Sequence, residues 1–249
     1  MTTDDAFKID RRQPIVPQIY AQLQQMIVTM QFHPRQVLSE NELAERFDVS
    51  RTPVREALRK LVDYRLIDVF PQQGSVVSPI RIREILEGQF VREALEVAVV
   101  RKACRDGDRR ILEKLNHVMD EQREWGAKIS EGRCPLREGQ DSFMASDETF
   151  HRILTESIAQ ERSWSVIQSV KWQMDRVRFL SLNSATHIPV LIGQHEKICD
   201  AVMKRDENEA VRQTQIHLHE VFKTIRQLYD AHADLFEGDG NALVADDIG

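Results

Sequence analysis

Residues 38–78 read LSENELAERFDVSRTPVREALRKLVDYRLIDVFPQQGSVVS and contain the strongest indications of secondary structure in the chain. Its segment 39–42, SENE, has the pattern of a capping box, which predicts the start of a short helix. A further helix is predicted to begin at Ser50 or Thr52, both favourable N-cap residues, with Pro53 in its first turn. The short turn between these two helices is the first indication of a helix-turn-helix.

The flanking sequence completes a winged version of this motif. Upstream, after Pro17, apolar residues recur at helical spacing and predict a one-sided helix. These residues are Ile19, Leu23, Met26, Ile27 and Met30. Downstream, segments 67–70 and 75–78 have the pattern of two short strands around the turn 71–74, PQQG. Three helices followed by a β-hairpin predict a winged helix-turn-helix domain.

From residue 81 to about residue 234 the sequence shows helical patterns and no second pair of strands. The predicted helices are 81–105, 108–127, 140–160, 161–183, 188–204 and 206–235. Such a run of helices predicts an antiparallel all-helical bundle, so the expected fold class is mainly α. The predicted parts are a flexible N-terminal tail, 1–13, a winged helix-turn-helix DNA-binding domain, 14–78, a helical domain, 81–235, and a disordered acidic tail, 236–249.

Composition favours a cytoplasmic protein of two domains. The chain has 249 residues, of which 41% are hydrophobic, and this is enough for two ordinary cores. No stretch approaches the roughly 20 apolar residues of a membrane span, and the N-terminus lacks the pattern of a signal peptide. The three cysteines, Cys104, Cys134 and Cys199, are far apart and odd in number, so neither a disulfide framework nor a thiolate zinc site is expected.

Charge is distributed unevenly along the chain, whose formal net charge is -6. Within residues 49–65, five basic residues stand against two acidic ones, and this local excess favours contact with phosphate. Arg51 and Arg55 are four residues apart, at the start of a predicted helix, and share an outward face. The side chains near the start of such a helix meet base edges in the major groove, where Arg can bond guanine bidentately. The alternative is a solvated surface pair.

Residues 38–78 closely resemble the DNA-binding signature of the GntR family of bacterial transcription regulators. The resemblance lies in ELAE, in VSRTPVREAL and in a wing that carries a glycine. It implies double-stranded operator DNA as partner, with contacts from Asn41, Ser50, Arg51, Thr52, Arg55 and Gly74. In this reading Arg51 and Arg55 meet bases or phosphates, Thr52 assists at the backbone, and Gly74 lets the wing approach the minor groove. Asn41 stands where some members place Arg, which leaves the operator sequence open.

Four polar side chains in the C-terminal half fall on apolar helix faces. Asp147 and His151 share the stripe that contains Phe143 and Leu154, and His195 and His217 occupy equivalent faces of two later helices. Burying a polar group without a partner costs about 1 to 3 kcal/mol, so the four are expected to meet one another or a common ion. The alternative for each histidine is a hydrogen-bonded core residue.

The same four positions resemble the FCD branch of the GntR family, in which an Asp-x-x-x-His pair and two later histidines hold a metal. This resemblance implies a homodimeric regulator, most often a repressor, that binds a pseudo-palindromic operator and responds to a small organic acid. Zinc is the expected ion, with nickel or manganese as alternatives. In this family an Arg at the position of Arg92 binds the organic acid. The alternative for Arg92 is a salt bridge to Glu93 or Glu96.

The remaining expectations concern weaker candidates and rival functions. Arg178 and Asn183 are further candidates for the acid, although Arg176, Arg178 and Asn183 read more readily as parts of solvated faces. A metalloenzyme is a rival, because a site of three histidines and a carboxylate can activate water. Against an enzyme, the sequence shows no nucleophile motif and no general base beside the ligands. An enzyme would also leave the predicted N-terminal DNA-binding domain unexplained. A DNA-binding protein with a purely structural metal is the second rival.

Overall fold

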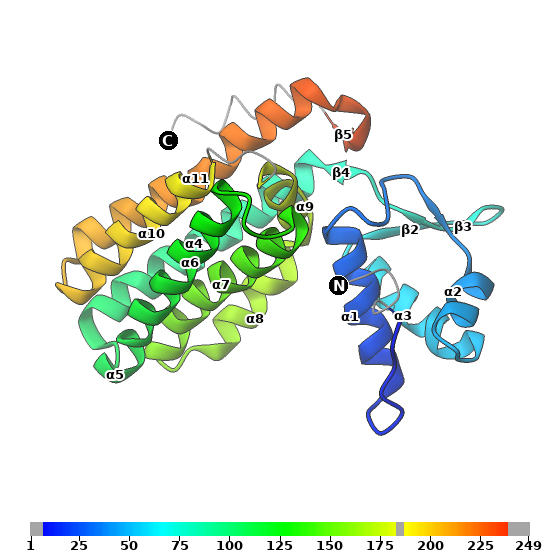
Figure 1. Cartoon of the computed structure of the whole chain (residues 1–249), viewed down its shortest axis with the longest axis horizontal. Coiled ribbons are helices and arrows are strands. Elements are labelled where there is room, and N and C mark those ends of the chain that lie inside the picture. Colours follow the sequence, from blue (N-terminus) through cyan, green and yellow to red (C-terminus); the bar gives the residue numbers. More distant parts are fainter. Residues whose placement is uncertain (1–6, 183–186, 239–249) are drawn as a thin grey trace.

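Three helices and a small antiparallel sheet form the N-terminal part of the chain (Figure 1), which we describe from a computed structural model covering residues 7–182 and 187–238. The helices are α1 (Ile15–Val28), α2 (Glu40–Arg46) and α3 (Arg51–Asp63), and the strands are β1 (Val37–Leu38), β2 (Ile67–Phe70) and β3 (Gly74–Val77). The strand order is β1-β3-β2, with Phe70 paired to Gly74 at the tip of the hairpin. The predicted winged helix-turn-helix arrangement is confirmed, and the short strand β1 adds to it.

Apolar residues from all three helices form the core beneath this sheet. Ile19 and Leu23 of α1, Leu43 of α2, and Val54 and Leu61 of α3 are buried together. The spacings of four residues in α1 and seven residues in α3 place one stripe of each of these helices inward, as the sequence pattern indicates. The opposite face of α3 is left exposed.

The C-terminal part is an antiparallel helical bundle, as predicted (Figure 1). Its helices are α4 (Ile82–Asp106), α5 (Arg109–Leu112), α6 (Lys114–Ser130), α7 (Leu136–Ser157), α8 (Glu161–Val170), α9 (Trp172–Ser181), α10 (His187–Met203) and α11 (Glu207–Ala231). The prediction of a single helix over 161–183 is wrong, because the helix is interrupted at Lys171, between α8 and α9. The ammonium group of Lys171 is buried and pairs with Asp175 Oδ2 at 2.6 Å and with Glu148.

Both ends of the described chain are more ordered than the sequence suggests. In the expected flexible tail 1–13, the ring of Phe7 packs edge-on against Phe47 at 4.9 Å between centroids; residues 1–6 lie outside the described part. In the expected tail 236–249, Phe236 is buried. It lies in β5 (Phe236–Glu237), which pairs in parallel with β4 (Ile80–Arg81). The order at both ends has the same cause, because a single aromatic side chain in a polar segment packs against an apolar surface of the fold. Residues 239–249 are outside the described part.

Within residues 7–182 and 187–238, no helix combines the length and the apolar character needed to cross a membrane.

Candidate metal centre and nucleic-acid interface

The N-terminus of α3 presents two arginines on an exposed face. Ser50 is the N-cap residue, although its side chain makes no capping hydrogen bond, and Pro53 follows in the first turn. The side chains of Arg51 and Arg55 are 56% and 64% exposed, so both are accessible to a partner in solution. Thr52 lies beside them and is also exposed.

Glu40, at the start of α2, holds both guanidinium groups. Its carboxylate accepts from Arg51 Nη2 at 3.1 Å, and from Arg55 Nε at 3.2 Å and Nη2 at 3.0 Å. The hydrogen bond from Arg55 and the nearby charges lower the pKa of Glu40, so the carboxylate stays ionised. Asn41, the next residue, is exposed. Sequence reasoning treated Glu40 only as part of a capping box and missed this bridge.

Gly74 begins β3 at the tip of the hairpin with a φ of +81°. This left-handed conformation is unfavourable for a residue with a Cβ, which explains a glycine at this turn. An added Cβ would meet no atom of the described chain within 4 Å. The constraint at Gly74 is therefore conformational, and the tip stands clear of the rest of the protein.

The four predicted metal ligands lie together in the centre of the bundle. Asp147 and His151 come from α7, His195 from α10 and His217 from α11, and all four are buried. One ligand atom from each lies within 4.8 Å of the others. The helical spacing places each side chain on the inner face of its helix, and the packing of α7, α10 and α11 brings the three faces together.

Hydrogen bonds orient the three imidazoles with Nε2 towards a common centre. The Nδ1 atoms lie 2.8 Å from Gln122 Oε1 for His195, 3.1 Å from Gln194 Oε1 for His217, and 2.6 Å from Glu96 Oε2 for His151. Oxygen acceptors at Nδ1 require the proton to be there, which leaves the lone pair of each Nε2 pointing inward. The Nε2 of His217 is 3.2 Å from that of His195 and 3.3 Å from that of His151.

This donor set fits a divalent metal ion. Nε2 lone pairs that face one another across 3.2 to 3.3 Å repel unless a cation lies between them, and the donor near His151 Nε2, Arg92 Nη2, is 3.4 Å away. Asp147 Oδ1 is buried with no hydrogen-bond partner among the described residues. Outer acceptors on each Nδ1 are the usual support of a metal-bound histidine. Three imidazole nitrogens and one carboxylate oxygen suit zinc, and also nickel or manganese where coordination is higher.

Two arginines separate this cluster from a cavity. Arg92 Nε donates to Glu96 at 2.5 Å and its Nη2 lies 3.4 Å from His151 Nε2, while Arg178 donates to Asp147. The salt bridge expected as an alternative for Arg92 is therefore present, with Glu96. Arg92 also lines the cavity, so the two readings of this residue are compatible.

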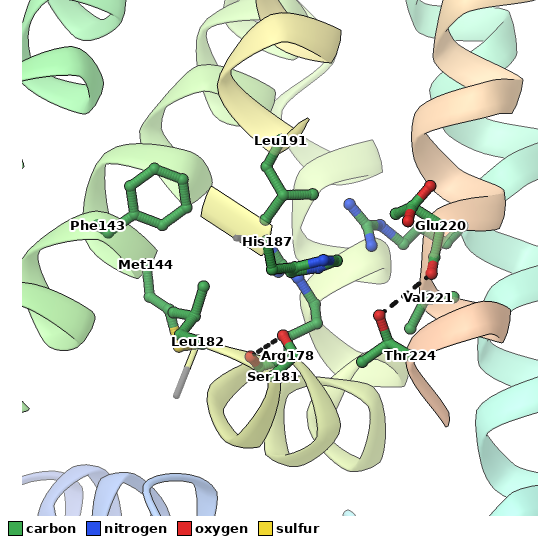
Figure 2. Close-up of a pocket in the computed structure, with 11 residues that line it drawn as sticks. Phe143, Met144, Arg178, Ser181, Leu182, His187, Leu191, Glu220, Val221 and Thr224 are labelled. Atoms are coloured by element: carbon green, nitrogen blue, oxygen red, sulfur yellow. Dashed lines mark hydrogen bonds between the residues drawn. The ribbon is translucent and has the colours of Figure 1, made fainter. Parts of the chain in front are cut away.

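The cavity itself is small and opens into a wider groove. It has a volume of about 30 Å³, room for one or two water molecules, and adjoins a groove of about 590 Å³. Figure 2 shows the side chains of Arg178, His187 and Glu220 turned towards it. Ser181, His187, Glu220 and Thr224 line both spaces. Sequence reasoning missed His187 and Glu220, whose positions follow from packing; the predicted Asn183 lies outside the described residues.

Two arginines of α9 were expected on solvated faces, and for both this is wrong. Arg178 is paired with Asp147 and with Asp175 Oδ1 at 3.2 Å, and its side chain is 16% exposed. Arg176 is fully buried. The reason is that α9 packs against the bundle on one side and against α1 on the other, so it has no broad solvent-facing side.

Burial and charge control the protonation of the cluster. Burial lowers the pKa of His195 to about 3 and, with the neighbouring histidines, holds the pKa of His217 well below its usual range. Burial would raise the pKa of Asp147 and of Glu96, but the nearby arginines and histidines outweigh it; the pKa of Glu96 falls to about 2. The expected resting state is two carboxylates with neutral imidazoles at His195 and His217, and metal binding requires neutral imidazole ligands.

The metal-free chain is expected to lose stability as the pH falls from about 6.5 towards 3. In this window unfolded histidines take up protons that folded His195 and His217 refuse, so the unfolded state binds more protons. Each such group lowers the free energy of unfolding by about 1.4 kcal/mol per pH unit. Urea denaturation in the presence of a chelator, at several pH values, measures the slope. A His195→Asn variant should show a shallower slope; an equal slope would contradict the prediction.

The sequence and the fold agree with known proteins. Residues 16–77 match the family described as bacterial regulatory proteins, gntR family, and residues 83–220 match the FCD domain. The structure of McbR/YncC from Escherichia coli is similar, with a TM-score of 0.71 over 86% of this chain and 98% of that chain, at 18% identity. A GntR transcriptional regulator from Rhodococcus gives a TM-score of 0.68 over 84% of this chain and 97% of that chain, at 22% identity. These two structures support the fold.

Sequence relatives support the family. The HTH-type transcriptional repressor RspR of Escherichia coli is 34% identical over 92% of this chain and 96% of that protein. The HTH-type transcriptional repressor NanR of Cronobacter sakazakii is 27% identical over 87% of each chain. Family and relatives together indicate a transcriptional regulator and not an enzyme. The chain therefore belongs to the GntR family of bacterial regulatory proteins, as a transcriptional regulator with an FCD domain.

Proposed function

We propose that this regulator is a homodimeric repressor of a pseudo-palindromic operator, and that its helical bundle binds a divalent metal ion, zinc first, together with a small carboxylate effector. Arg51 and Arg55 read the operator, Thr52 assists at the backbone, and the wing at Gly74 approaches the minor groove. The names of RspR and NanR, both repressors, support repression. A symmetric dimer supports a symmetric operator, since two reading helices then meet two half-sites.

The observation that carries the metal site is the inward convergence of three Nε2 lone pairs beside a carboxylate oxygen, Asp147 Oδ1, that has no hydrogen-bond partner among the described residues. Asp147, His151, His195 and His217 would hold the ion. When bound, the ion supplies a positive charge that attracts an anion. The chain's own part is to orient the three imidazoles, through Gln122, Gln194 and Glu96.

Charge balance supports an anionic effector. Asp147 and Glu96 carry two negative charges, and Arg92 and Arg178 carry two positive ones, so these four side chains are neutral together. Asp175, which also pairs with Arg178, is balanced by the buried ammonium group of Lys171. A divalent ion would leave about two positive charges uncompensated in a site of low dielectric, where unpaired charge is costly. A carboxylate reaching the cavity meets Arg92 and Arg178, which can bond it bidentately. The effector would enter through the groove beside His187 and Glu220.

The test uses the full-length protein and an operator fragment selected from genomic DNA. Fluorescence anisotropy measures operator affinity for zinc-loaded and chelator-treated protein with a panel of hydroxy, keto and sugar acids. An effector should weaken operator binding by roughly 5- to 150-fold, and operator DNA should weaken effector binding by the same factor. The matched control is Arg178→Met, which should remove the response.

Two outcomes of that test would contradict the proposal. Unchanged operator affinity with every acid that calorimetry shows to bind would remove the effector role. If chelation unfolds the bundle while no acid binds, the ion is structural and the responsive function is lost.

Glu40→Gln is expected to reduce operator specificity more than affinity for DNA in general. The substitution removes a negative charge close to DNA, which favours phosphate contacts, but it also frees Arg51 and Arg55 to adopt other rotamers. The ratio of affinities for operator and random DNA should fall several-fold in competition binding at fixed salt. Glu42→Gln, an exposed position in the same helix, is the control and should keep the ratio. Equal ratios for both variants would remove the orienting role of Glu40.

A further inference from the structure

Helix α9 lies at the side of the bundle that faces the winged part of the chain, where it packs against α1 (Figure 1). It is ten residues long, and its two sides contact different structures. On one side, Arg178 and Ser181 line the cavity, and Arg178 donates to Asp147. Gln173 and Arg176, one turn apart on the opposite side, contact the winged part.

Gln173 and Arg176 bind the backbone where the wing begins and ends. Gln173 Nε2 donates to Arg65 O at 2.7 Å and lies 3.2 Å from Ser78 Oγ, while Arg176 Nη1 donates to Ser78 O at 2.9 Å. Ser78 in turn donates to the same region, through its hydroxyl to Arg65 O at 2.8 Å and its amide to Leu66 O at 3.0 Å. Because α3 ends at Asp63, two residues before Arg65, these bonds fix the end of the reading helix as well as the base of the wing.

Arg176 is buried at the junction between α9 and the winged part, although its guanidinium has no carboxylate partner among the described residues. Its side chain is fully buried, and its Nε and Nη2 have no hydrogen-bond partner within the described ranges. Burial lowers the pKa of this guanidinium to about 9. A buried guanidinium without a carboxylate is costly, so a hydrophobic residue of similar size would give a more stable junction. Specific recognition of the Ser78 carbonyl is the function that the arginine adds.

We propose that Gln173 and Arg176 are positioning residues through which α9 couples occupancy of the metal and effector site to the position of α3, the helix that reads the operator. A change in the pairing of Arg178 shifts a short rigid helix whose other side holds Arg65 and Ser78. A pocket of about 350 Å³, lined by Tyr64 and Gly88 among others, lies beside the end of α3. The link to an effector rests on the proposed function; the mechanical link between Arg178 and Ser78 does not.

Another contact crosses the same junction and provides a control. Arg137, on α7, donates from Nη1 to Thr29 O at the end of α1, at 2.8 Å. It joins the bundle to the winged part and makes no bond to Arg65 or Ser78, although its guanidinium also lies over the ring of Phe179 on α9, 4.7 Å from the ring centroid. A general loosening of the junction should therefore follow from Arg137→Gln, and a specific loss of transmission from changes at 173 and 176.

Hydrogen-deuterium exchange on the full-length protein tests this inference with two separate inputs. The first input is zinc against chelator, and the second is Arg178→Met in metal-free protein. Each should change the exchange rate of the amides of residues 64–66 and 77–78 by roughly 5-fold or more. In the Gln173→Leu variant, and in Arg176→Lys, the change should be lost although zinc still binds; Arg137→Gln should keep it.

The outcomes separate the two proposals. If calorimetry shows that zinc does not bind the wild-type chain, the proposed function fails, while the Arg178→Met input still decides the mechanical link. If neither input alters exchange in these segments, or if the response survives both variants at 173 and 176, the inference is overturned. A response lost equally in Arg137→Gln would also overturn it, because the route would then be the whole junction.

Discussion

Replacing Arg51 and Arg55 together by alanine is expected to lower operator affinity by about 100-fold or more. Each bidentate contact from arginine to guanine contributes about 1 to 3 kcal/mol of discrimination, and 1.4 kcal/mol is a tenfold change in affinity. Both side chains project from the first turns of α3, where a recognition helix meets base edges, and both are exposed. The larger part of the loss should therefore fall on the operator, with a smaller loss on random DNA.

The measurement is anisotropy with operator and random fragments at several salt concentrations. The control is Arg59→Ala with Lys60→Ala, which removes the same charge from exposed positions later in the same helix. That variant should weaken both kinds of DNA about equally, since phosphate contacts carry no sequence information. If the Arg51 and Arg55 variant retained an operator footprint at the wild-type concentration, α3 would not be the reading helix.

The predictable parts of this chain are those in which local chemistry is decisive. Caps, a first-turn proline and a turn glycine mark the elements around α2, α3 and the wing, and each acts within a few residues. The metal cluster could also be predicted from the sequence, because helical spacing shows which side of a helix is buried. Asp147, His151, His195 and His217 all occupy that side. Periodicity cannot show that four buried groups meet; the free-energy cost of burying polar groups without partners indicates that they share a site.

The missed residues depend on contacts between distant segments. Gln122 and Gln194 orient two imidazoles, but nothing near either glutamine in the sequence distinguishes it from a surface residue. Arg176 and Arg178 were misplaced because α9 is covered on both sides by packing, which no pattern within ten residues reveals. For Arg92 a local signal existed, since residues four apart on a helix meet and adjacent residues do not; this favours Glu96 over Glu93.

Replacing His217 by alanine is expected to abolish tight zinc binding and with it most of the stability that zinc adds. A ligand present at 1,000 times its dissociation constant stabilises the folded state by about 4.1 kcal/mol, so zinc should raise the melting temperature of the wild-type protein by many degrees. The variant loses one of four ligands and leaves Gln194 without its imidazole partner. Thermal unfolding with zinc and with chelator, together with calorimetric titration, measures both effects.

His219→Ala is the matched control for this prediction. His219 lies two residues further along α11, on another side of the helix, where its Nε2 is 2.8 Å from Glu93 Oε2. The His219→Ala protein should bind zinc as the wild type does, and zinc should raise its melting temperature by the same amount. A rise that is lost in both variants would point to helix damage, and a rise that survives His217→Ala would remove this histidine from the metal site.

The pH dependence of zinc binding distinguishes this buried site from an exposed cluster of histidines. An exposed cluster must release protons when metal binds below its usual pKa of about 6.5, so its affinity falls steeply from pH 7 to pH 6. Here burial has already removed that competition at His195, whose pKa is about 3, and at His217. Zinc affinity should therefore change little between pH 7.5 and pH 6, and titrations in buffers of different ionisation enthalpy should show few protons released. A release of two or more protons per zinc at pH 6 would mean that these imidazoles are charged before the metal arrives, and the preorganised site argued from their hydrogen bonds would be wrong.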